Sequence, residues 1–250
     1  MDYETPKNSI AFRLRGRFAL FTDPLTRVGG EKCSYPIPTY EALKGVTKSI
    51  YWKPSLIWVI DRVRVMNPIR TQTKGMKPLK YHETGNDLSI YTYLADVEYQ
   101  VEAHFEWNLA RPELQNDWVD GKHFSIVRRM LDRGGRQDIF LGTRECQGYV
   151  EAFEPKKGEG FGKGPGAYDA TPEIPFGLMF HGFDYPDETG RNELHARFWR
   201  PVMKAGVIGF VRPENCPTRR FVREMVPKHF EPDRNFTGLE EPGLLEETRA

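Results

Sequence analysis

A lysine and a histidine stand side by side, at Lys122 and His123, where a polar loop leads into a predicted helix. Lysine supplies a fixed positive charge, and histidine is the side chain whose ordinary pKa lies nearest neutrality. One group can move a proton while the other stabilises negative charge on phosphorus, as phosphodiester chemistry requires. Backbone N–H groups at a helix start also attract an anion. The alternative is an exposed Lys-His pair at an ordinary helix start.

A second candidate is the stretch Tyr51-Trp52-Lys53-Pro54, at the end of an earlier predicted helix. Tyr51 could move a proton or orient a ribose hydroxyl, and Lys53 could meet a phosphate. The alternative is that Tyr51 and Trp52 are helix-end aromatic residues that pack on a sheet.

Basic residues form three further groups, although the whole chain is balanced at 36 Lys and Arg against 35 Asp and Glu. Any case for nucleic-acid binding therefore rests on where the charges lie. Basic side chains with aromatic neighbours can hold phosphates and stack unpaired bases, whereas the alternative is a solvated surface. The three groups are Arg13, Arg15 and Arg17; Arg70, Lys74, Lys77 and Lys80; and Arg128, Arg129, Arg133 and Arg136.

Several classes of site find no support in the sequence. The glycine-rich stretch 158–166 lacks GxxxxGK[ST] and GxGxxG, so a linker is the better interpretation. The histidines show no metal-ligand spacing, and no metal or cofactor is expected. Three scattered cysteines without a CxxC pair fit a cytoplasmic protein. No run of about 18 apolar residues exists, so no membrane contact is expected.

The predicted elements that must position these residues follow the order strand, helix, strand, strand, helix, strand. Thr39 is a plausible N-cap for the first helix, and Pro54 stops it. Alternation is clearest between Val97 and Trp107, where apolar and polar residues take opposite faces. The order predicts an α+β fold with a ferredoxin-like (RRM-like) βαββαβ domain. The predicted elements are 10–21, 40–50, 56–65, 97–107, 122–133 and one strand over 138–153, bent at Gly142 or Gly148.

The rest of the chain predicts a second, smaller unit. We expect a ferredoxin-like domain over 1–153, a Gly-rich linker over 154–175 and a small antiparallel β-sheet domain over 176–230. A hairpin joined by PDETGRN forms its centre, and Val207 to Phe210 is expected to add a third strand. The acidic tail 231–250 is expected to be disordered.

Long stretches of the chain resemble the CRISPR-associated protein family five, subtype I-C (Dvulg), of the RAMP superfamily. The resemblance runs from about Ile10 to Phe230 and is far more specific than the short motifs. The stretches that carry it are ALFTDPLTRVGGEKCSYPIPTYEALKGVTKSIYWKP (Ala19 to Pro54), YTYLADVEYQVEAHFEWN (Tyr91 to Asn108), GKHFSI (Gly121 to Ile126), IFLGTRECQGYV (Ile139 to Val150) and HGFDYPDETG (His181 to Gly190).

The resemblance implies a ferredoxin-like domain followed by a small β-sheet. It implies an endoribonuclease that cuts precursor CRISPR RNA at the 3′ base of the repeat hairpin. Such a protein then stays with the mature guide RNA, beside the backbone and large subunits of the interference complex, where contact with DNA could follow. The family's catalytic residues, a Tyr at the end of the first helix and a Lys-His pair, fall on Tyr51, Lys122 and His123.

The mechanism that these residues favour is attack by the ribose 2′-OH on the adjacent phosphate without a metal. We expect His123 to transfer the proton, Tyr51 to assist or orient, and Lys122 to stabilise the charge, while the choice of base and acid stays open. The expected RNA contacts are Arg13, Arg15, Lys53, Lys74, Lys77, Arg128, Arg129 and Arg133. The alternative function is a non-catalytic subunit that caps the 5′ end of the guide RNA and supports assembly.

Overall fold

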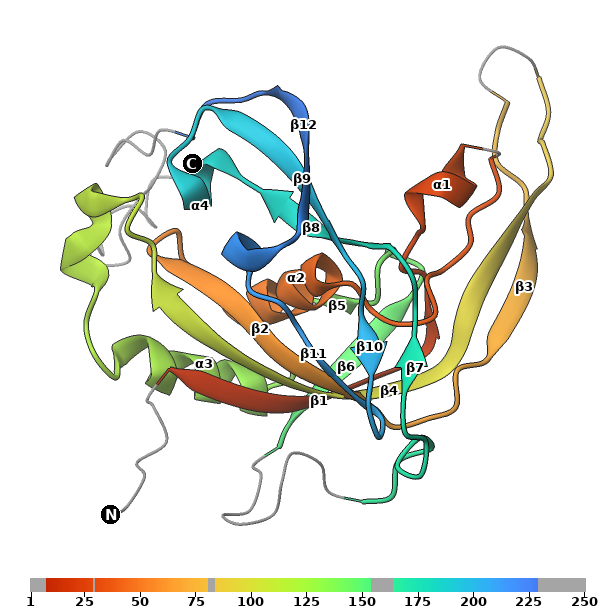
Figure 1. Cartoon of the computed structure of the whole chain (residues 1–250), viewed down its shortest axis with the longest axis horizontal. Coiled ribbons are helices and arrows are strands. Elements are labelled where there is room, and N and C mark those ends of the chain that lie inside the picture. The colour runs from red at the N-terminus through yellow and green to blue at the C-terminus, as the bar shows by residue number, and fades with distance from the viewer. Residues whose placement is uncertain (1–7, 29, 81–83, 154–163, 229–250) are drawn as a thin grey trace, which may run out of the picture.

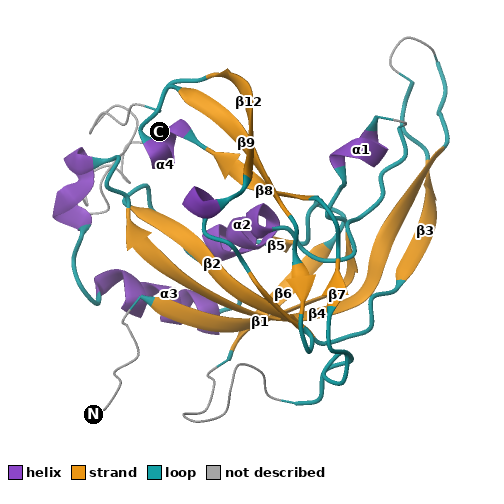
Figure 2. Cartoon of the chain, in the orientation of Figure 1, coloured by secondary structure: helices purple, strands orange, loops and turns teal. Residues whose placement is uncertain are grey.

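The computed structural model describes residues 8–228, apart from 29, 81–83 and 154–163. The fold is a mixture of helices and strands, as Figure 2 shows, and the paired strands of its sheets are antiparallel. The glycine-rich stretch up to residue 163 and the acidic tail, two parts of the predicted domain plan, lie outside the described residues. No helix among the described residues combines the length and apolar character needed to cross a membrane.

A seven-stranded sheet forms the centre of the molecule (Figure 1). Its strands follow the order β11-β2-β4-β1-β6-β5, and β3 pairs with the first part of β4. Every neighbouring pair in it is antiparallel. The strands are β1 (Ser9–Ala19), β2 (Leu56–Val65), β3 (Thr71–Met76), β4 (Ser89–Trp107), β5 (Ile139–Phe140), β6 (Gln147–Ala152) and β11 (Val207–Gly209).

Two helices, α2 (Tyr40–Ile50) and α3 (Lys122–Asp132), pack on the sheet and on each other. The Thr39 hydroxyl accepts the Ala42 N–H and caps α2, as the sequence predicts. Helix α3 begins after Gly121, whose φ of 76° is open to glycine at little cost. The other helical segments among the described residues have one or two turns: α1 (Pro24–Arg27), α4 (Pro186–Thr189) and the 3₁₀ helices η1 (Pro112–Asp117) and η2 (Pro213–Asn215).

The alternation predicted for β4 is confirmed for most of its residues, although Gln100 on the polar face is buried as well. Val97, Tyr99, Val101, Ala103 and Phe105 are all buried. β4 also begins earlier than predicted, because its first residues pair with β3. Together β3 and this part of β4 extend away from the body as a two-stranded arm (Figure 1). The arm carries Lys74, a member of the basic group formed by Arg70, Lys74, Lys77 and Lys80.

The prediction of a single bent strand over 138–153 is wrong. The segment forms two short strands, β5 and β6, that pair with each other. Gly142 lies between them with φ 96°, and a Cβ there would come within 2.1 Å of the Leu20 carbonyl oxygen. The chain therefore reverses where a glycine meets another backbone closely, rather than bending within one strand.

The C-terminal part forms a three-stranded sheet in the order β12-β9-β8. The expectation that Val207 to Phe210 supplies its third strand is wrong, because β11 pairs with β2 in the main sheet and β12 takes that place. Residues 164–175 also reach the main sheet, where Asp169 pairs with Arg64 at 2.7 Å. The remaining strands are β7 (Ile174–Pro175), β8 (Met179–Asp184), β9 (Glu193–Trp199), β10 (Val202–Met203) and β12 (Thr218–Glu224).

A buried ion pair joins this small sheet to α2. Lys44 of α2, only 1% exposed, pairs with Glu188 of α4, and Lys48 reaches the same carboxylate at 3.0 Å. Nearby, the rings of His181 on β8 and Tyr40 on α2 stack at 4.2 Å. Helix α2 is therefore held between the main sheet and the small sheet, and the residues that follow it inherit that fixed position.

Candidate active site

Tyr51 is the first residue after α2, and its backbone is extended, with φ −162°. The Tyr51 N–H donates to the Thr47 carbonyl, and the Tyr51 carbonyl accepts from the Trp58 indole N–H at 2.8 Å. Both bonds fix the direction in which the side chain leaves the helix end. Its ring is 2% exposed and packs beneath the start of α3.

His123 lies on the inner face of α3, one and two turns before the buried Val127 and Leu131. The histidine is fully buried, with the rings of Phe105 and Trp107 edge-on to it. Its Nδ1 lies 2.9 Å from the Tyr51 hydroxyl oxygen. Residues 72 positions apart in the sequence thus share a hydrogen bond. An exposed histidine at an ordinary helix start is not what the structure shows.

Lys122 is the outward member of the group. Its side chain is 47% exposed, and its amine donates to Asp117 Oδ1 at 2.9 Å. Asp117, at the end of η1, accepts also from the Ser55 hydroxyl. Its backbone carbonyl lies 2.7 Å from His123 Nε2. Neither Asp117 nor Ser55 belongs to any motif or spacing in the sequence, so sequence reasoning missed both.

The electrostatics of the group follow from burial and from Asp117. Burial, and next the charge of Asp117, raise the pKa of Tyr51 to about 12, against the opposing charge of Arg136. The phenol is therefore protonated at neutral pH. Burial by itself raises the pKa of Asp117, but hydrogen bonds from Ser55 and Lys122 hold it below its ordinary value. Asp117 is consequently a carboxylate at neutral pH.

The predicted RNA contacts spread over three parts of the molecule. Lys53 lies two residues after Tyr51, whereas the exposed Arg128, Arg129 and Arg133 follow Lys122 along α3, over about 16 Å. On β1, Arg13 pairs with Glu98 at 3.3 Å and Arg15 pairs with Glu151. Neighbouring carboxylates thus reduce the positive charge that these two residues present.

The arm presents a different surface. The Lys74 amine lies 3.3 Å from the centroid of the Phe18 ring and 5.4 Å from that of Tyr93. Lys77, just beyond β3, is exposed. The structure therefore gathers Tyr51, Lys122 and His123 and leaves Lys74 and Lys77 on a separate element.

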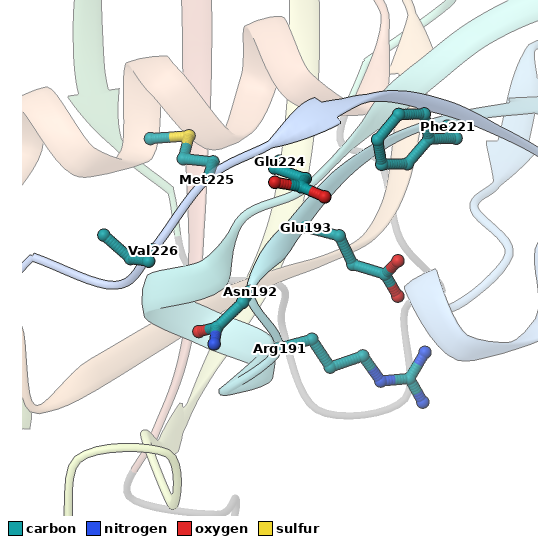
Figure 3. A pocket seen from close by; sticks show the side chains of 7 residues that line it. All are labelled: Arg191, Asn192, Glu193, Phe221, Glu224, Met225 and Val226. Atoms are coloured by element: carbon teal, nitrogen blue, oxygen red, sulfur yellow. The ribbon is translucent and has the colours of Figure 1, made fainter.

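A surface groove lies elsewhere, where β9 meets β12 (Figure 3). None of the predicted site residues lines it. Its charges are mixed, since Arg191, Glu193 and Glu224 all line it. Within the described residues, no three His, Cys, Asp or Glu side chains gather as ligands for a metal ion.

The chain matches known proteins over most of its length. Residues 9–211 match the family described as CRISPR-associated protein (Cas_Cas5), in its Cas5d form. The CRISPR pre-crRNA endoribonuclease Cas5d of Mannheimia succiniciproducens is 30% identical over 228 residues, which cover 80% of this chain and 94% of that protein. The protein of the same name from Thermus thermophilus is 29% identical, over 79% of this chain and 82% of its own.

A solved structure shares the fold as well. A crystal structure described as a CRISPR-associated protein superposes with a TM-score of 0.71 at 34% identity. The match covers 85% of this chain and 96% of the other. The family match extends over the strands and helices that position Tyr51 and His123. The chain therefore belongs to the Cas5d family of CRISPR-associated proteins.

Proposed function

We propose that this protein is a metal-independent endoribonuclease that cleaves precursor CRISPR RNA at the 3′ base of the repeat hairpin. The observation that carries the proposal is the convergence of Tyr51, His123 and Lys122 from the ends of two helices. The names of the two Cas5d relatives agree with it. The strands lie in the order β6-β1-β4-β2. Along the chain, α2 connects β1 to β2 and α3 follows β4, and this arrangement supports a ferredoxin-like core as the scaffold.

The chemistry that we propose is internal transesterification. The 2′-oxygen attacks the adjacent phosphorus, the bond from phosphorus to O5′ breaks, and a 2′,3′-cyclic phosphate and a 5′-OH remain. His123 takes up the proton of the nucleophile with the help of Tyr51. Lys122 stabilises the added negative charge on the phosphorane.

The product then remains bound in the proposed sequence of events. Exposed Arg128, Arg129 and Arg133, together with Lys53, extend positive charge outward from Lys122 for the phosphates of the hairpin. Arg13, Arg15, Lys74 and Lys77 would contact RNA at the sheet and the arm. We propose that the protein holds the mature guide RNA beside the backbone and large subunits of a type I-C interference complex, in the cytoplasm.

A second candidate function is a non-catalytic subunit that caps the 5′ end of the guide RNA. One observation favours it: the chain covers His123 completely and Tyr51 almost completely. A purely structural role would use the Tyr51–His123 hydrogen bond to fix α2 against α3. Catalysis instead requires that RNA binding shift the side chains above the Tyr51 hydroxyl.

The deciding experiment incubates the protein in EDTA with its cognate repeat hairpin. A matched hairpin carries a single 2′-deoxyribose just 5′ of the scissile phosphate. We expect the all-RNA hairpin to be cut and the deoxy hairpin to bind equally but stay intact, since phosphates and hairpin shape supply most of the affinity. Cutting of the deoxy hairpin at the same bond, or strict dependence on added Mg²⁺ or Mn²⁺, would contradict the mechanism.

Variants separate the two candidate functions. Tyr51→Phe keeps the buried ring and removes only the hydroxyl, and Lys122→Ala removes the exposed amine. We expect both to slow single-turnover cleavage by about 100-fold or more while RNA affinity is retained. Tyr149→Phe, at an exposed tyrosine on β6, is the matched control and should cut like the unchanged protein. Unchanged cleavage rates in Tyr51→Phe and Lys122→Ala would show that the catalytic site lies elsewhere, whereas the absence of cleavage by the unchanged protein would favour the non-catalytic subunit.

A further inference from the structure

Asp117 contacts every polar member of the candidate site except Tyr51. Its carboxylate accepts from the Lys122 amine at 2.9 Å and from the Ser55 hydroxyl. Its carboxylate oxygen Oδ2 also lies 3.4 Å from His123 Nε2. Its backbone carbonyl is closer to that nitrogen, at 2.7 Å. A single residue at the end of η1 therefore touches Lys122 and His123, which lie on α3, and Ser55, which precedes β2.

The carbonyl contact determines where the imidazole proton lies. A backbone carbonyl oxygen can only accept, so His123 Nε2 carries the hydrogen of this bond. In the neutral imidazole, Nδ1 is then without a proton and accepts. The group 2.9 Å away is the Tyr51 hydroxyl, which is protonated. The direction of that hydrogen bond follows: Tyr51 donates and His123 accepts.

The direction of the bond gives each residue a distinct place in the reaction. His123 is fully buried, so its nearest route to the substrate passes through the Tyr51 oxygen. The 2′-OH gives its proton to that oxygen while the tyrosine's own proton moves to Nδ1. The new bond forms from O2′ to phosphorus, the bond from phosphorus to O5′ breaks, and solvent protonates O5′. The imidazolium later returns its proton to solvent.

We propose that Asp117 is a positioning residue of this site. Its carbonyl holds His123 in the tautomer that accepts a proton from Tyr51. Its carboxylate holds the Lys122 amine beside the same pair, where the phosphate charge develops. This inference rests on the proposed function, and it resolves which side chain is the proton acceptor.

The first test reads the tautomer directly in the protein with ¹⁵N-labelled histidine. At a pH where His123 is neutral, we expect a protonated-type signal for Nε2 and an unprotonated-type signal for Nδ1. Tyr51→Phe should shift the Nδ1 signal and leave Nε2 in place, because only the donor to Nδ1 is lost. A neutral His123 that carries its hydrogen on Nδ1 would overturn the assignment, whether or not the protein cuts RNA.

The second test measures single-turnover cleavage by Asp117→Asn, which keeps the backbone carbonyl and removes the carboxylate charge. We expect a rate about 10- to 100-fold lower, as for other losses of alignment at a reacting centre, with RNA affinity and melting temperature nearly unchanged. Asp120→Asn makes the same change at an exposed position in the same loop and should cut at the unchanged rate.

The outcomes separate this inference from the proposed function. If the unchanged protein cuts the hairpin and Asp117→Asn cuts at the same rate, the positioning role is wrong while the nuclease stands. If the unchanged protein does not cut, the proposed function fails, and the ¹⁵N spectra still decide the tautomer. A rate loss that merely follows a lower melting temperature would assign Asp117 a structural role and also contradict the proposal.

Discussion

The substitution Glu188→Gln should destabilise the protein strongly, because it leaves Lys44 buried without its anion. Lys44 is 1% exposed and pairs with Glu188 across the boundary between α2 and α4. Burial lowers the pKa of Lys44 more than the charge of Glu188 raises it, so without Glu188 the buried site would disfavour the ammonium form still more. Breaking a buried pair at one partner typically costs about 3–5 kcal/mol. Lys44 can lose its proton, so we expect the lower end, about 3 kcal/mol.

Urea unfolding at pH 7 measures this loss. With a slope of about 2–3 kcal/mol per M, the midpoint should fall by about 1 M or more. Lys48→Met removes the more exposed partner of the same carboxylate and should cost less than about 1 kcal/mol. The double variant Lys44→Met with Glu188→Leu should recover most of the loss, since an apolar pair of similar size replaces the ions.

The pH dependence gives an independent check. The charges of Lys44 and Lys48 lower the pKa of Glu188 below its ordinary 4.5, although burial alone would raise it. The unfolded chain therefore takes up this proton first as the pH falls. The contribution of Glu188 to the free energy of unfolding is complete above pH 4.5. It is lost as the pH falls through the lower pKa that Glu188 has in the folded protein. Equal losses in Glu188→Gln and Lys48→Met, or a double variant as unstable as the sum of its parts, would refute this reasoning.

Three further predictions concern other parts of the molecule. The urea midpoint of Gly142→Ala should be much lower than that of Gly134→Ala. Both glycines have positive φ, but only a Cβ at Gly142 would meet another backbone, so equal midpoints would contradict this reasoning. Burial, and next the charge of Arg197, lower the pKa of His181 to about 3, so the unfolded chain alone binds this proton between pH 6.5 and 3. The free energy of unfolding should therefore decrease as the pH is lowered across that window, by up to about 1.4 kcal/mol per pH unit. His181→Phe should make this pH dependence weaker. Replacing Arg128, Arg129 and Arg133 with Gln should reduce the slope of log K against log salt for hairpin RNA by about 0.7–0.9 per lost phosphate contact, whereas the same change at Arg191, Arg220 and Arg223 should leave it unchanged.

The sequence predicted the elements whose signals are local. Helix α2 begins and ends as predicted because the spacing of its apolar residues lies within the helix, and the Thr39 cap and Pro54 lie close to its two ends. The bounds of β2 also agree with the predicted strand 56–65. The alternation of β4 reports its burial directly, because neighbouring residues of a strand take opposite faces.

Pairing partners were less predictable. A three-residue strand such as β11 carries no information about its partner, which packing of distant segments decides. Gly142 reads equally well as a kink or as a reversal, and only the approach of Leu20 distinguishes them. Asp117 has no motif, because its role arises from three contacts with residues 5, 6 and 62 positions away.

The cover over the Tyr51 hydroxyl has a consequence for selectivity if the proposed function holds. Most RNA in a cell offers the same phosphates and 2′-OH groups as the repeat, so the chemistry alone cannot discriminate. An RNA must first supply free energy, from contacts away from the scissile bond, to move the covering side chains. Each 1.4 kcal/mol that this movement requires slows the cutting of a weakly held transcript about tenfold. The buried hydroxyl thus makes recognition of the whole hairpin a condition for cleavage, as in other enzymes that assemble their site on the correct substrate.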